Sequence, residues 1–220
     1  MAHPTFASFQ DKRRQQEALS RRLLAHVRAG QALQGFAIQH VQGSDGCPDF
    51  AYTIGLYERG YPELLISGLS AQTRVHWLLD LGFRMVGPPP LKTRLKGYAC
   101  TLLARVQGQR VTWPSFPPGG QKIQAGIRYS DLAEDGYPTI FANVAPAFYH
   151  THLSLAMRYY GHRDFPVLQV VWPDVAERFP WDERSHTCQQ CFFDQRHLIA
   201  LLAAHAPYNR IYPPVRTPTL

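Results

Sequence analysis

Four side chains near the C-terminus have the chemistry of zinc ligands. The segment HTCQQCFFDQRH, residues 186–197, places a Cys-x-x-Cys pair between two histidines, and the four candidates are His186, Cys188, Cys191 and His197. Two thiolates and two imidazole nitrogens would complete a tetrahedral zinc site. The crowding of all four into one short segment is unusual, because zinc sites commonly take their second ligand pair from elsewhere in the chain. Zinc is the one cofactor that the sequence suggests.

The same segment allows two other interpretations. Cys188 would lie at a helix N-terminus, where the helix dipole lowers a thiol pKa and favours redox chemistry. No thioredoxin-like strand–helix–strand pattern precedes it, however. In the third interpretation Cys191 is buried beside Phe192 and Cys188 has no chemical role. The sequence leaves all three open.

Polar residues within two apolar segments form a second candidate site. Glu63 precedes a run of leucine and isoleucine, where a carboxylate must be paired or lie at a solvent boundary. Gln169 interrupts another apolar run, and a buried amide needs hydrogen-bond partners, from the backbone or from a ligand. Asp174 follows that run and could instead hold a turn through its own backbone. The candidate pocket residues are Tyr52, Thr53, Glu63, Gln169, Trp172 and Asp174.

The elements that must position these residues follow from the pattern of apolar residues. The segment FAYTIGLYERGYPELLISGL, residues 50–69, predicts two strands around a tight turn. The segment PVLQVVWPDVAERFPWDE, residues 166–183, begins with a strand that is apolar on both faces, which suits a central position. We expect these two segments to adjoin in one sheet and to bring their polar residues to a common edge.

The chain as a whole predicts an α+β fold with a mostly antiparallel sheet of about five or six strands and flanking helices. Further strands are expected over residues 34–42, 98–106 and 139–144, and helices over residues 8–29, 70–86, 147–160 and 190–205. Residues 112–135 are rich in proline and glycine and predict a long loop. We therefore divide the chain into a basic N-terminal helix (1–29), an α+β core domain (30–183) and a C-terminal helix with a proline-rich tail (184–220).

Composition limits the class of protein. With 220 residues, 45% of them hydrophobic and 18% charged, the chain can bury the core of one folded domain. The net charge is +7, and six basic residues crowd the first thirty positions: Lys12, Arg13, Arg14, Arg21, Arg22 and Arg28. That cluster is typical of a solvated helix face and lacks the interleaved aromatic residues of a nucleic-acid surface. Nucleic acid is therefore not the favoured partner; an unidentified ligand or protein is.

Membrane and export signals are missing from the sequence pattern. The N-terminal residues lack the apolar core of a secretory signal. No run approaches the roughly twenty apolar residues that span a bilayer. We therefore expect a cytoplasmic protein without a membrane partner, and its four cysteines are expected to be reduced thiols or metal ligands.

Several separated motifs resemble the bacterial domain of unknown function family 4262. GFAIQHV (35–41) resembles its opening strand, FAYTIGL (50–56) its signature and GYPELLISGL (60–69) the segment that follows. Downstream, residues 143–161 and 167–182 resemble its closing helix, strand and Pro-Trp turn, so the resemblance covers about residues 30–183. Many members carry a cysteine pair near the N-terminus that this chain lacks. The resemblance implies a small soluble bacterial domain and no particular catalytic residue.

Familiar catalytic motifs are absent from the sequence. It contains no Gly-x-Ser-x-Gly elbow, no Walker-type phosphate loop, no Gly-x-Gly-x-x-Gly turn and no His-Glu-x-x-His pair. We therefore expect a binding or protein-interaction module. The alternatives are an enzyme whose pocket is lined by the acids and amides named above and a domain clipped by zinc.

Overall fold

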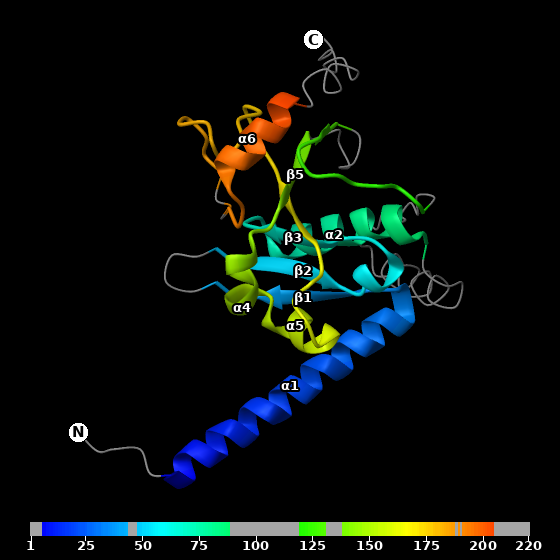
Figure 1. Ribbon diagram of the computed structural model, residues 1–220, viewed down its shortest axis with the longest axis vertical. Coiled ribbons are helices and arrows are strands. Elements are labelled where there is room, and N and C mark those ends of the chain that lie inside the picture. Colours follow the sequence, from blue (N-terminus) through cyan, green and yellow to red (C-terminus); the bar gives the residue numbers. More distant parts are fainter. Residues whose placement is uncertain are drawn as a thin grey trace, which may run out of the picture.

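A six-stranded sheet forms the centre of the computed structural model, which describes residues 6–43, 48–88, 119–130, 138–187, 189 and 191–204 (Figure 1). The strand order is β1-β2-β3-β6-β5-β4. Along the chain the elements are α1 (Phe6–Gln34), β1 (Ala37–Val41), β2 (Phe50–Ile54), the 3-10 turn η1 (Tyr57–Arg59), β3 (Glu63–Ser67), α2 (Ala71–Val86), β4 (Arg128–Tyr129), β5 (Thr139–Asn143), η3 (Pro146–Phe148), α4 (Tyr149–His152), α5 (Ser154–Tyr160), β6 (Val167–Val171) and α6 (Gln195–Ala204).

The pairing of β3 with β6 joins the two segments that the sequence singled out. These strands run parallel, with Glu63 opposite Val167 and Leu65 opposite Gln169, whereas the other four pairs are antiparallel. The predicted α+β class, the mostly antiparallel sheet and the central place of β6 are confirmed. A parallel pair requires a long crossover, and the whole chain between residues 67 and 167 supplies it.

The two faces of the sheet are covered by different helices. Alternate residues of β3 point to opposite sides, so Leu64 and Ile66 pack with Leu78 of α2 while Leu65 packs with Val27 of α1. Helix α5 completes the second layer through buried residues such as Leu155. A third cluster joins the β5–β6 end of the sheet to α6. Two-sided burial explains why β3 and β6 are apolar without alternation.

Helix α1 is longer than the sequence indicates. We expected the helix to end at residue 29, but it continues through Gly30, which packs so closely against β1 that an added Cβ would lie 2.9 Å from the Cβ of Ala37. The glycine therefore allows a close helix–strand contact, and the helix ends at Gly35, whose φ is 92°.

Other differences concern the second half of the chain. The single helix expected over residues 147–160 is divided into η3, α4 and α5, because Leu153 leaves helical geometry (φ −115°, ψ 25°) to bury its side chain. The short strand β4 occupies part of the segment expected to be a loop. The strand expected over residues 98–106 lies outside the described residues. In the described part of the chain, no helix has the length and apolar character to cross a membrane.

We predict that Gly82→Ala destabilises the protein although alanine favours helices. A Cβ at this position of α2 would lie 2.3 Å from the ring of Phe36, which is fully buried. Overpacking costs about 1–3 kcal/mol, more than the gain of up to about 1 kcal/mol in helix propensity. Urea unfolding should show a net loss near 1 kcal/mol. The double variant Gly82→Ala/Phe36→Leu should recover part of that loss; a Gly82→Ala protein as stable as the parent would contradict this packing.

Candidate functional site

The carboxylate of Glu63 is enclosed at the start of β3, where it is 1% exposed. Its Oε1 atom accepts hydrogen bonds from the backbone N–H of Gly55 at 2.8 Å, from that of Tyr57 at 3.0 Å and from the Tyr160 hydroxyl. Its Oε2 atom accepts from the Thr53 hydroxyl at 2.5 Å. The turn between β2 and β3 is thus built around one carboxylate, with α5 contributing the fourth donor.

Burial raises the pKa of Glu63, although the hydrogen bonds from Thr53 and Tyr160 act in the opposite direction. Burial likewise raises the pKa of the Tyr160 hydroxyl, and the neighbouring carboxylate adds to that effect. The Thr53 hydroxyl donates to Glu63 and also accepts a hydrogen bond from the Leu64 N–H at 2.8 Å. Every polar group of this cluster therefore has a partner inside the protein, which makes the cluster suited to holding the turn rather than to meeting a substrate.

Two further candidates are buried in the sheet. Tyr52 is 2% exposed on the face covered by α1 and α5, and burial raises the pKa of its hydroxyl. Gln169 is fully buried in β6; its Oε1 accepts from Phe192 N–H at 2.8 Å and its Nε2 donates to the Ser67 hydroxyl at 3.4 Å. Gln169 thus attaches β6 both to β3 and to the segment that precedes α6.

Asp174 organises the loop that follows β6. Its carboxylate accepts from the backbone N–H groups of Ala176 at 2.8 Å, Arg178 at 3.0 Å and His186 at 3.2 Å, and it pairs with the Arg178 guanidinium at 2.9 Å. Burial alone would raise the pKa of Asp174, but these hydrogen bonds hold it well below its usual value. The bond to Ala176 is the Asx-type contact expected of a turn-forming aspartate.

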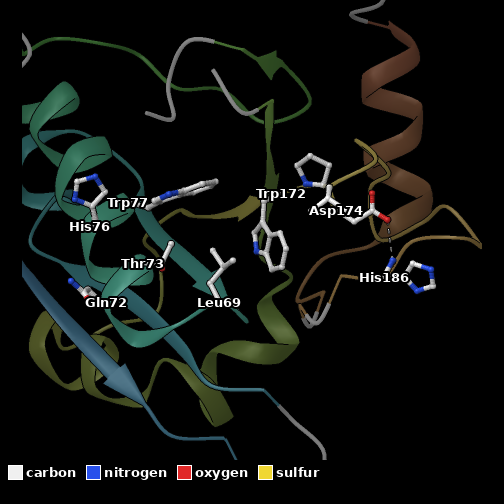
Figure 2. Close-up of a pocket in the computed structure, with 10 residues that line it drawn as sticks. Leu69, Gln72, Thr73, His76, Trp77, Trp172, Asp174 and His186 are labelled. Atoms are coloured by element: carbon white, nitrogen blue, oxygen red, sulfur yellow. Dashed lines mark hydrogen bonds between the residues drawn. The ribbon is translucent and has the colours of Figure 1, made fainter. Parts of the chain in front are cut away.

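A cleft of about 700 Å³ lies between α2 and the loop that follows β6 (Figure 2). Trp77 extends from α2 toward Trp172, and His76 and His186 stand at opposite ends (Figure 2). The indole N–H of Trp172 donates to the Ser67 carbonyl at 3.1 Å, which fixes its ring. The described residues that line it are Leu69, Gln72, Thr73, His76, Trp77, Trp172, Pro173, Asp174, Val175 and His186.

The parallel pair explains why the cleft forms at this edge. The chain leaves β3 and β6 at the same end of the sheet, where open crevices of α/β sheets bind ligands. The backbone at the rim is constrained. Leu69 and Glu177 both have φ of 57°, and they are the non-glycine residues with positive φ in the described part of the chain. Such conformations persist where the surrounding structure imposes them and are frequent at ligand sites.

The structure separates the residues that the sequence grouped into one pocket. Trp172 and Asp174 line the cleft, whereas Thr53 and Glu63 lie at the opposite end of the parallel strands. Tyr52 and Gln169 are enclosed between these places and do not line the cleft. The polar residues therefore do not share one edge of the sheet, as we had expected. Because β3 and β6 run parallel, Glu63 at the start of β3 lies far from the end of β6, which Trp172 and Asp174 follow.

Sequence reasoning missed the wall of the cleft contributed by α2. Its residues are Gln72, Thr73, His76 and Trp77, which the helix begins to present directly after the Ser70 cap. The Ser70 hydroxyl accepts from Thr73 N–H at 3.1 Å. A usable signal was present: Thr73, His76 and Trp77 have i, i+3, i+4 spacing and share one helix face.

Three of the four zinc candidates lie in the described part of the chain, and they form no metal site there. His186 lines the cleft, whereas His197 of α6 lines a separate cavity of about 190 Å³ next to Asn143. Cys191 is partly buried against the cluster that includes Phe193. Among the described residues, no group of three or more histidine, cysteine or acidic side chains could hold a metal. Cys188 lies outside those residues, so the zinc site remains a prediction.

We predict that the stability contribution of Glu63 decreases as pH rises. Because the pKa of Glu63 is raised in the folded protein, folding favours its protonated form, and that stability is lost as pH increases through the raised pKa. Glu63→Gln retains an acceptor at the Oε1 position and should flatten this dependence. The measurement is the free energy of unfolding in urea between pH 4 and pH 8, and an unchanged pH profile in Glu63→Gln would contradict it.

Truncation of the same side chain should be much more damaging than the amide substitution. Glu63→Ala would leave the Tyr57 N–H group and the hydroxyl groups of Thr53 and Tyr160 without their acceptor, whereas the Gly55 N–H would keep its bond to the Tyr160 oxygen at 2.7 Å. Each such group costs roughly 1–3 kcal/mol. We expect a loss of at least about 3 kcal/mol or failure to fold. Glu58→Ala on the same turn is the control. Glu58 accepts hydrogen bonds from Gln31 and Tyr159 but is exposed, so its removal should cost only about 1 kcal/mol.

Comparison with known proteins identifies the family of this chain but no activity for it. No curated protein and no solved structure shows significant similarity to the chain. The model of the family described as Domain of unknown function (DUF4262) matches residues 32–114 and 115–186, which include β1, the Glu63 turn, both walls of the cleft and His186. The resemblance noted from the motifs is thereby confirmed, and the chain belongs to the DUF4262 family.

Proposed function

We propose that this protein is a binding module and that the cleft between α2 and the loop after β6 is its ligand site. The observation that carries the proposal is the pair of tryptophans, Trp77 and Trp172, which line one cleft from two elements. The volume of about 700 Å³ is within the range of pockets for small organic ligands or for a few side chains of a peptide.

One wall of the cleft is held in place by contacts within the protein. The hydrogen bond to Ser67 fixes the Trp172 indole, and Asp174 fixes the loop behind it through backbone and guanidinium contacts. A wall that is already ordered loses little entropy on binding. Val175 adds an apolar side chain at the rim that is 93% exposed, so binding there would remove apolar surface from water.

The lining indicates the chemistry of the ligand. Two indoles favour a flat or ring-shaped apolar group, and Gln72, Thr73 and the two histidines offer hydrogen bonds around it. Asp174 is the one acid among the described lining residues, and it is paired with Arg178. We therefore expect a ring-bearing ligand with hydrogen-bonding substituents, either a small molecule or an aromatic or proline-containing peptide segment.

The enzyme alternative has less support. It needs the acids Glu63 and Asp174 to act on one substrate, whereas they belong to opposite ends of the parallel strands and each carboxylate already accepts several hydrogen bonds. A binding module of this kind agrees with the cytoplasmic location in a bacterium that the sequence predicts. Cell fractionation would test that location.

We predict that Trp77→Ala weakens ligand binding roughly tenfold, because an aromatic pair contributes about 0.5–1.5 kcal/mol beyond its buried area. Ligand-observed NMR with indole, adenosine and a proline-rich decapeptide measures the affinity of parent and variant. Ile199→Ala is the matched control, since it removes another apolar side chain, 47% exposed, outside the cleft. Absence of binding by all three probes, or equal losses in both variants, would refute the proposed site.

A further inference from the structure

Helix α1 carries much of the positive charge of the molecule on a surface that the domain leaves uncovered. The helix contains six basic and two acidic residues, so it accounts for four of the seven net positive charges. Its 29 residues extend about 43 Å, and its N-terminal half points away from the sheet (Figure 1). The basic surface of α1 is separate from the cleft, because α1 packs on one face of the sheet and the cleft is formed by α2, on the other face, and by the loop after β6.

The contacts of α1 with the domain use one side of the helix. Val27 is 1% exposed, and Leu23 and Leu24 pack beside it in the cluster that α1 shares with α5. Ser20 accepts a hydrogen bond from Arg158 of α5 on the same side of the helix. The remaining sides of the helix are therefore available to a partner.

The exposed arginines are ordered along this available surface. Arg14, Arg21 and Arg28 are spaced by seven residues, which places them in one row with steps of about 10.5 Å, and all three are exposed. Arg22 is exposed beside the row. None of the four forms an ion pair within the part of the chain whose side chains are described.

The sequence pattern did not favour nucleic acid as a partner, but the exposed row gives a reason to revise that expectation, and we propose that this arginine row on α1 binds the phosphate backbone of nucleic acid. Guanidinium groups form paired, charge-assisted hydrogen bonds with phosphate, and a row about 21 Å long spans roughly a dozen charges of a duplex. Among the α1 side chains that the structure describes, from Arg14 onward, none is a phenylalanine, tyrosine or tryptophan that could stack on bases. Binding is therefore independent of sequence and dominated by electrostatics.

The proposal predicts a specific dependence on salt. Three to four phosphate contacts give a slope of about −3 for the logarithm of affinity against the logarithm of salt concentration. The affinity for a duplex should then fall about sixty-fold between 50 and 200 mM salt. Fluorescence anisotropy with two unrelated labelled 20-base-pair DNA duplexes measures this slope and should give similar affinities for both.

Two matched triple variants test whether the arginine row of α1 is the nucleic-acid site. Arg14→Gln/Arg21→Gln/Arg28→Gln should weaken binding at least tenfold, whereas Arg163→Gln/Arg184→Gln/Arg196→Gln removes the same charge from exposed positions outside α1 and should change it less than threefold. Glutamine is a good helix former, and circular dichroism checks that both variants remain folded. Equal losses in the two variants, or a slope near zero, would overturn the proposal.

Other anionic partners are distinguished in the same assay. Poly-glutamate represents an acidic protein, and vesicles containing phosphatidylserine represent an anionic membrane. Both should compete with the duplex more weakly than unlabelled duplex does at equal charge. Stronger competition by either one would overturn nucleic acid as the partner of α1.

Discussion

The parallel pairing of β3 with β6 determines where the polar side chains of this protein come to lie. Both strands are buried on two faces, so a polar group within them must be satisfied by the protein itself, as Glu63 and Gln169 are. A polar group that follows either strand can instead reach the open edge. Since β3 and β6 end at the same edge, the segments after them form two walls of one cleft.

The two carboxylates that appeared most promising for chemistry have structural roles of different kinds. Glu63 is surrounded by four donors from three elements and holds the turn between β2 and β3 against α5. Asp174 accepts mainly from its own loop and keeps the chain after β6 in a defined path. In both cases the carboxylate fixes the conformation of the backbone around it, and at Asp174 that backbone forms part of the wall of the cleft.

The molecule therefore presents two surfaces of opposite character. One is the cleft, which has two indoles and few charges; the other is the arginine row of α1, which is strongly charged. They lie on opposite sides of the sheet, separated by the layers that α1, α5 and α2 form against it. A ligand in the cleft and a polyanion on α1 would thus occupy distinct sites.

The sequence by itself determined the class of fold, the order of nearly all described elements and the family, because apolar periodicity and separated motifs are local properties. It also identified Glu63, Gln169 and Asp174 as groups that need hydrogen-bond partners. A buried polar group needs such a partner whichever part of the chain supplies it, so the need can be recognised from the sequence. Only the tertiary structure decided which partners these are. The direction of β6 relative to β3 is set by a hundred-residue crossover, and that direction separates Glu63 from Asp174 and brings Trp77 of α2 opposite Trp172.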